Sequence, residues 1–202
     1  MTTRPQSMNR SHPPRHETML LRNGLIVDGT GRACYDGDVL IRDGRIADIG
    51  TGLSVPETAD VIDCRGSVIA PGFIDMHSHN DWFMAFPGHG AATRPFLHQG
   101  ITTFVTGNCG FSAAGFHPAR PHLTRIRDLV FKATGLKLGW HSVDDYFGVL
   151  EANGLTHNLL LLAGHGSVRT AIRDFRPGAL DADEQHLLQR DLEIALEQGA
   201  AG

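Results

Sequence analysis

Residues 68–79 read VIAPGFIDMHSH, an apolar run that ends in two histidines separated by one serine. The run from Val68 to Ile74 is nearly continuous rather than alternating, which is typical of a parallel strand buried on both faces. Two similar runs follow, at Ile101–Val105 and Leu159–Ala163. The segments between the runs are long enough for crossover helices. The sequence therefore predicts an α/β domain built on a parallel sheet.

Residues suited to metal or acid–base chemistry follow each predicted strand. His77 and His79 come after the first strand, Asn108 and Cys109 after the second, and His165 after the third. In β/α barrels the functional residues lie at the carboxyl ends of several strands. The pattern predicts one site at which these side chains converge.

The His77-Ser78-His79 segment has a geometric reason to bind a metal ion. In an extended chain, residues i and i+2 point to the same side, so both imidazoles face one ion and Ser78 points away. Asp75 and Asp81 are candidates for carboxylates that orient the two rings. A His-x-His pair by itself is more often structural or solvent-exposed. Its position directly after a predicted buried strand favours the metal-binding interpretation.

Cys109 lies between Gly107-Asn108 and Gly110, in a tight turn where the backbone approaches another group closely. A thiolate there would be a strong zinc ligand. A cysteine nucleophile is the alternative, and it would require a histidine base held by a third group. His165, flanked by glycines, is a candidate for substrate binding, with a loop hydrogen bond as the plainer alternative.

Residues 19–67 contain short β-segments separated by turns, ahead of the parallel strands. The pair Asn23-Gly24, between two apolar segments, predicts a hairpin. A second turn is predicted at Asp43-Gly44. The unit is expected to be antiparallel, with alternating buried and exposed residues. Its further predicted strands are Asp38–Ile41, Arg45–Ile49 and Asp60–Asp63.

The clearest predicted helix runs from Asp181 to about Gln198. Asp181 and Glu184 have the spacing of a capping box, and Gly199 is a natural helix stop. Two more helices are predicted at 125–136 and 142–152. The apolar stripe of the first helix is expected to comprise Leu188, Leu192, Ala195 and Leu196.

The composition is that of an ordinary globular protein, with 202 residues, 41% hydrophobic and 20% charged, and a net charge of −4. No basic block indicates nucleic acid, and no apolar run reaches the roughly 20 residues of a membrane span. The three irregularly spaced cysteines argue against disulfides and for a reducing compartment, so we expect a cytoplasmic protein. Residues 1–18 are expected to form a disordered leader, and most of the remaining histidines to lie at the surface.

Several of these segments resemble one enzyme superfamily. Residues 23–31 and 38–46 are similar to the opening β-sandwich strands of the amidohydrolase superfamily, and Ala70–His79 resembles its first barrel strand. Gly100–Ser112, with its Asn-Cys-Gly motif, is similar to the D-aminoacylase (N-acyl-D-amino-acid deacylase) branch, in which a cysteine after the second strand ligates zinc. Gly164–Arg169 resembles the same branch.

The resemblance implies a fold and a chemistry. It implies that residues 68–202 are the first three to four strands of a TIM-like (β/α) barrel, and that residues 19–67 are part of a β-sandwich. It implies zinc (Zn2+) as the metal, with His77 and His79 matching one metal position, Cys109 matching the tightly held zinc, and room for a second, weak site. The implied reaction is hydrolysis of an N-acyl amino acid by zinc-activated water. The catalytic aspartate of the family comes from a later strand, so no catalytic residue is assigned in this chain.

Two alternatives remain open at this point. A cyclic-amide hydrolase of the dihydroorotase or hydantoinase kind shares the His-x-His segment, and an inactive fragment would bind no metal. Because a β/α barrel needs about 250 residues, we expect the 202 residues to be a truncated product with little activity alone. The expected partner is a small-molecule substrate, with no nucleic acid and no membrane.

Overall fold

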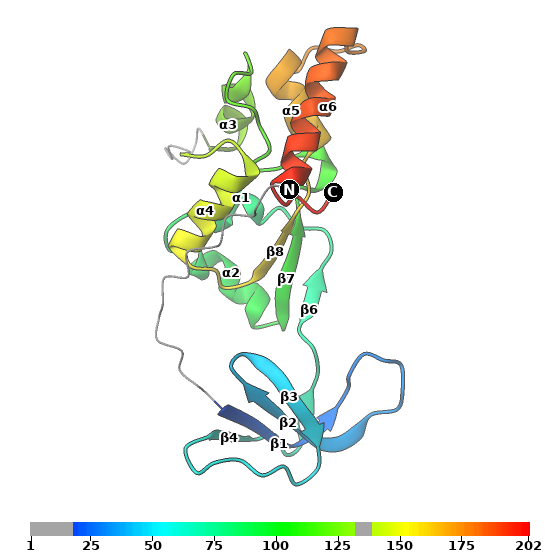
Figure 1. The fold of residues 1–202 in the computed structure, drawn as a ribbon, viewed down its shortest axis with the longest axis vertical. Helices are drawn as coiled ribbons and strands as arrows, with labels where there is room; N and C mark the ends of the chain where they lie inside the picture. Colours follow the sequence, from blue (N-terminus) through cyan, green and yellow to red (C-terminus); the bar gives the residue numbers. More distant parts are fainter. Residues whose placement is uncertain (1–17, 132–138) are drawn as a thin grey trace, which may run out of the picture. The chain divides into compact units, whose positions relative to one another are not determined.

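A computed structural model describes residues 18–131 and 139–202 (Figure 1). The leader prediction therefore lies almost entirely outside the described residues. The chain divides into two compact units, with the division between Pro71 and Gly72. In the described part of the chain, no helix combines the length and apolar character that crossing a bilayer requires.

The first unit is one five-stranded sheet of order β3-β2-β1-β4, in which β5 also pairs with β1. The β1–β2 and β2–β3 pairs are antiparallel, and β2 and β3 are joined at Asp43-Gly44 as predicted. However, β4 and β5 run parallel to β1. The prediction of a purely antiparallel unit is therefore wrong. The strands are β1 (Thr18–Ile26), β2 (Tyr35–Arg42), β3 (Arg45–Gly50), β4 (Asp60–Asp63) and β5 (Val68–Ile69).

The hairpin predicted at Asn23-Gly24 is wrong, because β1 continues through both residues. Asn23 has φ of 61°, and the register with β2 shifts next to it, so the pair forms a bulge. The N–H of Asn23 donates to Asp38 Oδ1 at 2.9 Å, which fixes the bulge to the neighbouring strand. The Ile69 side chain fills the space beside Gly24, where a Cβ would come within 2.4 Å of it. Asn-Gly supplies the left-handed conformation that a bulge needs as readily as it supplies a turn.

Burial in this sheet does not alternate as predicted. Four consecutive residues of β2, Gly37 to Leu40, are buried, whereas every residue of β4 is exposed. Asp38 is one of the buried four, and its carboxylate accepts the N–H groups of Asn23 and Leu53. These backbone hydrogen bonds hold the pKa of Asp38 below its ordinary value. Asp38 can therefore occupy a buried position where an apolar residue is expected, because backbone N–H groups bind its carboxylate oxygens.

The second unit is built on a three-stranded parallel sheet of order β6-β7-β8, which confirms the parallel prediction. Its strands are β6 (Phe73–Asp75), β7 (Ile101–Thr106) and β8 (Asn158–Leu161). The predicted single strand Val68–Ile74 is wrong, because Val68-Ile69 pairs with β1 and only its last residues enter this sheet. Pro71 has no N–H to donate, and a Cβ on Gly72 would overlap Thr102, so the chain changes sheets at this dipeptide.

Only the central strand of this sheet is well buried. Phe104, Val105 and Thr106 of β7 are buried, but Phe73 and Ile74 of β6 are 64% and 56% exposed. Burial on both faces, predicted for all three strands, therefore fails for β6 and for most of β8, where Leu160 is 44% exposed. At the end of β8, Ala201 donates to the Leu161 carbonyl, and Ala163 donates to the Gly202 carbonyl.

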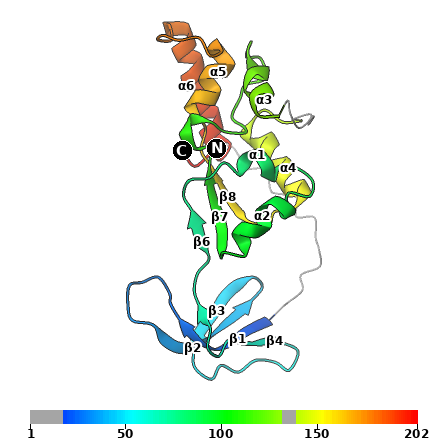
Figure 2. The same cartoon turned by 180° about the vertical axis from the view of Figure 1, so that it is seen from behind.

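The helices follow the strands in the order expected of β/α units (Figures 1 and 2). They pack around Phe104 and Tyr146 in one apolar core. Most of the remaining histidines were expected at the surface, but His89 and His157 are buried here, and the His157 ring stacks on Phe104 at 4.5 Å. The elements are α1 (Asp81–Met84), α2 (Gly90–Leu97), the short 3-10 helix η1 (Asn108–Gly110), α3 (Leu123–Phe131), α4 (Val143–Asn153), α5 (His165–Arg173) and α6 (Ala182–Glu197).

The predicted capping box of α6 is present, since the Asp181 carboxylate accepts the N–H of Glu184 and the Glu184 carboxylate accepts that of Asp181. The predicted stripe is wrong at Leu196, which is 50% exposed. Asp191 is buried instead, because the guanidinium of Arg120 donates two hydrogen bonds to it. The helix predicted at 142–152 is confirmed as α4. The one predicted at 125–136 begins at Leu123 and lies partly outside the described residues.

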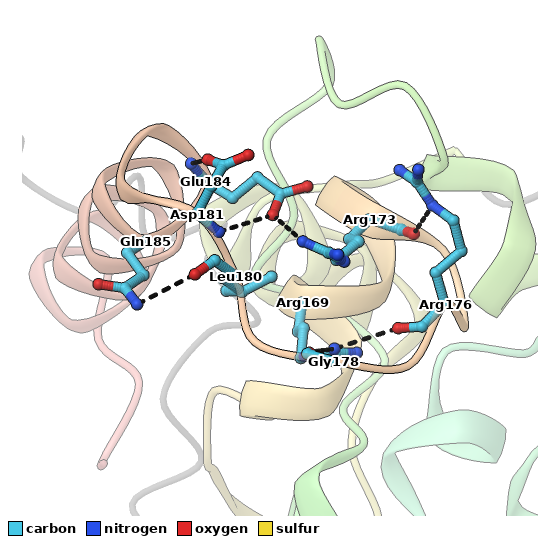
Figure 3. A network of polar contacts seen from close by, with 8 residues as sticks. All are labelled: Arg169, Arg173, Arg176, Gly178, Leu180, Asp181, Glu184 and Gln185. Atoms are coloured by element: carbon cyan, nitrogen blue, oxygen red, sulfur yellow. Dashed lines mark hydrogen bonds and ion pairs between the residues drawn. The ribbon is translucent and has the colours of Figure 1, made fainter.

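Arginine side chains fix the connection between α5 and α6 (Figure 3). Arg169 donates to the carbonyls of Arg176 and Gly178, at 3.2 and 2.8 Å. Arg173 forms an ion pair with Glu184, the residue that also caps α6. The helix pair that follows β8 is therefore held by polar contacts at its connection.

Candidate metal centre

The two histidines of the predicted metal site directly follow β6. Both side chains are exposed, whereas Ser78 between them is 5% exposed, which is the alternation that an extended segment produces. The N–H of Ser78 donates to the Val105 carbonyl at 3.1 Å, so β7 anchors the segment. The two imidazole centroids lie 5.9 Å apart, with the ring planes at 74°.

Cys109 lies in the turn after β7, and its backbone is left-handed with φ of 56° and ψ of 18°. Gly107 and Gly110 on either side also have positive φ, 79° and 78°. A Cβ at Gly107 would come 2.1 Å from the carbonyl oxygen of Leu162, so only glycine fits there. A non-glycine residue in the left-handed region costs about 1–2 kcal/mol. Strain of this kind is concentrated at functional sites.

The turn brings the thiol of Cys109 to the histidines. Its Sγ lies 3.3 Å from Nε2 of His77, and one donor atom from each of His77, His79 and Cys109 lies within 4.8 Å of the others. Two ligands at about 2.0 and 2.3 Å from a tetrahedral zinc ion would lie about 3.5 Å apart. Two imidazoles and a thiolate form a donor set that zinc favours. The residues present therefore fit the metal that the sequence pattern predicts.

Side chains of the same loops hold the two ligand-bearing segments together. The Asn108 amide donates to the carbonyls of Val105 and Ser78, at 2.9 and 3.3 Å. Asn108 thus links the turn that carries Cys109 to the residue between the two histidines. The strand-end position of Asn108 marked it in the sequence, but its bridging role could not be read there.

The two aspartates predicted to orient the imidazoles bind backbone instead. Asp75 Oδ1 accepts the N–H of His77 at 3.1 Å, and Asp81 Oδ2 accepts the N–H of Ala113 at 2.8 Å. Asp81 is fully buried. Burial raises its pKa to about 7, although the N–H groups of Ala113 and Gly107 lower it. The prediction that these carboxylates face the rings is therefore wrong.

His165 is the first residue of α5, and its side chain is exposed. It is not one of the three residues whose donor atoms converge. The residue before it, Gly164, nevertheless packs closely against the Cys109 turn. A Cβ at Gly164 would lie only 2.6 Å from the Gly110 carbonyl oxygen. The expected substrate role remains a prediction.

Two serines, which the sequence patterns did not single out, tie this third loop to the second. Ser112 donates its N–H to Ser167 Oγ at 2.9 Å and accepts the N–H of Gly164 at 2.9 Å on its own Oγ. Both serines are fully buried. Small polar residues near strand ends were the only signal of this network in the sequence.

No family model matches the chain. It is 37% identical to an N-acyl-D-glutamate deacylase and 33% identical to an N-acyl-D-aspartate deacylase, both from Alcaligenes xylosoxydans xylosoxydans. The matches cover 91% and 94% of this chain but 36% of each relative. The chain therefore spans about a third of the length of these relatives.

Two solved structures share the fold and the sequence. One is the N-acyl-D-glutamate deacylase of Bordetella bronchiseptica, complexed with zinc and a phosphonate mimic of the tetrahedral intermediate. It is 37% identical, with a TM-score of 0.71, over 89% of this chain and 36% of that protein. The other is a D-aminoacylase described as defining a subset of amidohydrolases, 32% identical with a TM-score of 0.75, over 91% of this chain and 37% of that protein. In sequence and in fold, this mixed α/β chain is similar to the D-aminoacylases and N-acyl-D-amino-acid deacylases among the amidohydrolases, over the third of their length that it spans.

Proposed function

We propose that this chain supplies the metal-binding segment of a zinc-dependent amidohydrolase that removes the acyl group from N-acyl-D-amino acids. The convergence of His77, His79 and Cys109 carries the proposal, since each comes from a strand end and their donor atoms lie within 4.8 Å of one another. The deacylases that match over more than nine-tenths of the chain support the choice of substrate class, and they favour it over a cyclic amide.

The role of this chain is to hold the metal and leave one side of it open. A zinc ion bound here would polarise an acyl carbonyl and lower the pKa of a water molecule to about 7. Catalytic zinc sites have three protein ligands and one open position. The three side chains are exposed, so substrate can reach them. Ser78, Asn108 and the strained turn fix the ligands from the buried side.

For the architecture, we propose that residues 68–202 form the first strands of a β/α barrel and residues 19–67 part of a β-sandwich. The parallel order β6-β7-β8 supports the barrel, as do the backbone hydrogen bonds that join Ala201 and Gly202 to Leu161 and Ala163. For the substrate contact we propose His165, which is exposed beside the Cys109 turn. The three cysteines are free, which fits a reducing compartment such as the cytoplasm.

A thiol nucleophile is the second candidate function. The 3.3 Å contact between His77 Nε2 and Cys109 Sγ is also the geometry of an imidazole base beside a nucleophile. In that case the chain would hydrolyse its substrate without a metal, through a covalent acyl-enzyme. Metal analysis separates the two functions.

The experiment is elemental analysis of the purified chain and three variants. We expect zinc in the parent chain and in Cys34→Ser, whose thiol is exposed in the first unit, and loss of zinc in Cys109→Ser and His77→Asn. Zinc should also protect Cys109 from alkylation by iodoacetamide. A parent chain without zinc, whose Cys109 alkylates rapidly, would favour the thiol function. Deacylation should be assayed with N-acetyl-D-glutamate and its L-enantiomer as the stereochemical control.

A further inference from the structure

We propose that Asp81 is a positioning residue of the metal centre, whose buried carboxylate holds the loop carrying Cys109 in place relative to His77 and His79. The inference rests on the proposed zinc site and adds a residue that is not one of the three proposed ligands. Asp81 lies two residues after His79, at the start of α1, and is fully buried.

The carboxylate of Asp81 reaches from the histidine segment to the far side of the cysteine loop. Its Oδ2 accepts the N–H of Ala113, four residues after Cys109, at 2.8 Å. This one side chain therefore joins the histidine segment to the loop that carries the thiol. Movement of the loop away from His77 would break this contact.

Two buried aromatic donors fix the partners of this hydrogen bond. The Tyr146 hydroxyl donates to the Asp81 carbonyl at 2.7 Å, and the Trp140 indole donates to the Ala113 carbonyl at 2.9 Å. The two rings pack with centroids 5.7 Å apart. Burial raises the pKa of Tyr146 well above its ordinary value, so the phenol remains a donor. The aromatic pair thus holds both ends of the Asp81–Ala113 contact from the core side.

The carboxyl group of Asp81 is buried although, in the described part of the chain, one of its two oxygens has no hydrogen-bond partner to offset the loss of water. Asp81 Oδ1 is buried and forms no hydrogen bond among the described residues. Asp191, the other deeply buried aspartate of the second unit, differs because Arg120 donates hydrogen bonds to both its oxygens. A buried polar oxygen without a partner costs stability. Asp81 therefore contributes more to the placement of the loop than to the stability of the core.

Cobalt(II) is the probe, because the thiolate-to-cobalt charge-transfer band reports ligation by Cys109 directly. The metal-free chain, Asp81→Asn and Asp191→Asn are titrated with Co2+ at a temperature where circular dichroism shows each to be folded. Asp81→Asn should lower the affinity about 10- to 100-fold, as residues that support metal ligands do, and weaken the charge-transfer band. Asp191→Asn, the control for a lost buried carboxylate, should leave both unchanged.

Tyr146→Phe is the second variant, since it removes only the hydroxyl that holds the Asp81 backbone. It should lower the Co2+ affinity by a smaller factor than Asp81→Asn does. If Asp81→Asn does not fold, Tyr146→Phe alone tests whether the position of Asp81 affects metal binding. A parent chain that binds no Co2+ overturns the proposed zinc site and this inference with it. A parent chain that binds Co2+ while Asp81→Asn and Tyr146→Phe bind equally well overturns this inference alone. Equal losses in Asp81→Asn and Asp191→Asn would show a merely structural role and would also overturn it.

Discussion

His77 Nε2 lies 3.3 Å from Cys109 Sγ, although the two residues are 32 positions apart in the sequence. Parallel pairing of β6 with β7 brings their carboxyl ends together, and the left-handed turn after β7 directs the thiol back toward β6. The contact is therefore a product of the sheet and of one strained turn. Each part can be tested separately.

Replacing Cys109 should separate metal binding from backbone strain. The left-handed conformation costs serine about 1–2 kcal/mol, whereas the extra freedom of unfolded glycine costs about 0.5–1 kcal/mol. We expect Cys109→Gly to have a free energy of unfolding up to about 1 kcal/mol higher than Cys109→Ser, and both to lose the metal. Urea denaturation of the metal-free variants measures the difference. A more stable serine variant would contradict the strain argument, and Cys34→Gly against Cys34→Ser is the control without positive φ.

Gly107→Ala should be strongly destabilising, by about 2–4 kcal/mol, because the new Cβ meets the Leu162 carbonyl in a left-handed conformation. Gly148→Ala is the matched control, since a Cβ at that position of α4 meets nothing within 4 Å. It should raise the stability by about 0.5–1 kcal/mol, as alanine does in a helix. Thermal unfolding of both variants checks the opposite signs. Similar effects of the two substitutions would show that the turn can relax.

Asp38 should make the first unit sensitive to acid. Backbone N–H groups from Asn23 and Leu53 hold its folded pKa below the unfolded value. The carboxylate therefore stabilises the fold above the unfolded pKa of about 3.9, and this contribution is lost as pH falls through the folded pKa. Asp38→Asn should lower stability at pH 7 and flatten the decline between about pH 5 and 3. Denaturant unfolding across that range measures it, with the exposed Asp60→Asn as control. An unchanged slope in Asp38→Asn would refute the assignment.

The ion pair between Arg120 and Asp191 should matter far more than an exposed one. The side chains of Arg120 and Asp191 are 10% and 1% exposed, and removing one partner leaves the other charge buried. Asp191→Ala should cost about 3–5 kcal/mol. Arg125→Ala, which breaks an ion pair whose arginine is 54% exposed, should cost far less, because solvent screens the pair. Chemical denaturation measures the free energy of unfolding of both variants. Equal losses would show that the buried ion pair contributes no more to stability than the exposed one.

The sequence patterns predicted the positions of the ligands better than the contacts around them. Strand ends and His-x-His spacing placed His77, His79 and Cys109 together because they depend on local periodicity and on parallel pairing. The Asn23-Gly24 pair forms a bulge and not the predicted turn, because both structures use the same left-handed conformation. The role of Asp81 was assigned to the wrong partner, because its hydrogen bond to Ala113 depends on how two loops pack and has no sequence period.

The most direct test of the proposed centre is zinc-edge X-ray absorption of the zinc-loaded chain. Ligation by two imidazoles and Cys109 predicts one sulfur at about 2.3 Å and nitrogen at about 2.0–2.1 Å from the ion. The sulfur shell should disappear in Cys109→Ser. A zinc environment containing only nitrogen and oxygen in the parent chain would contradict the account.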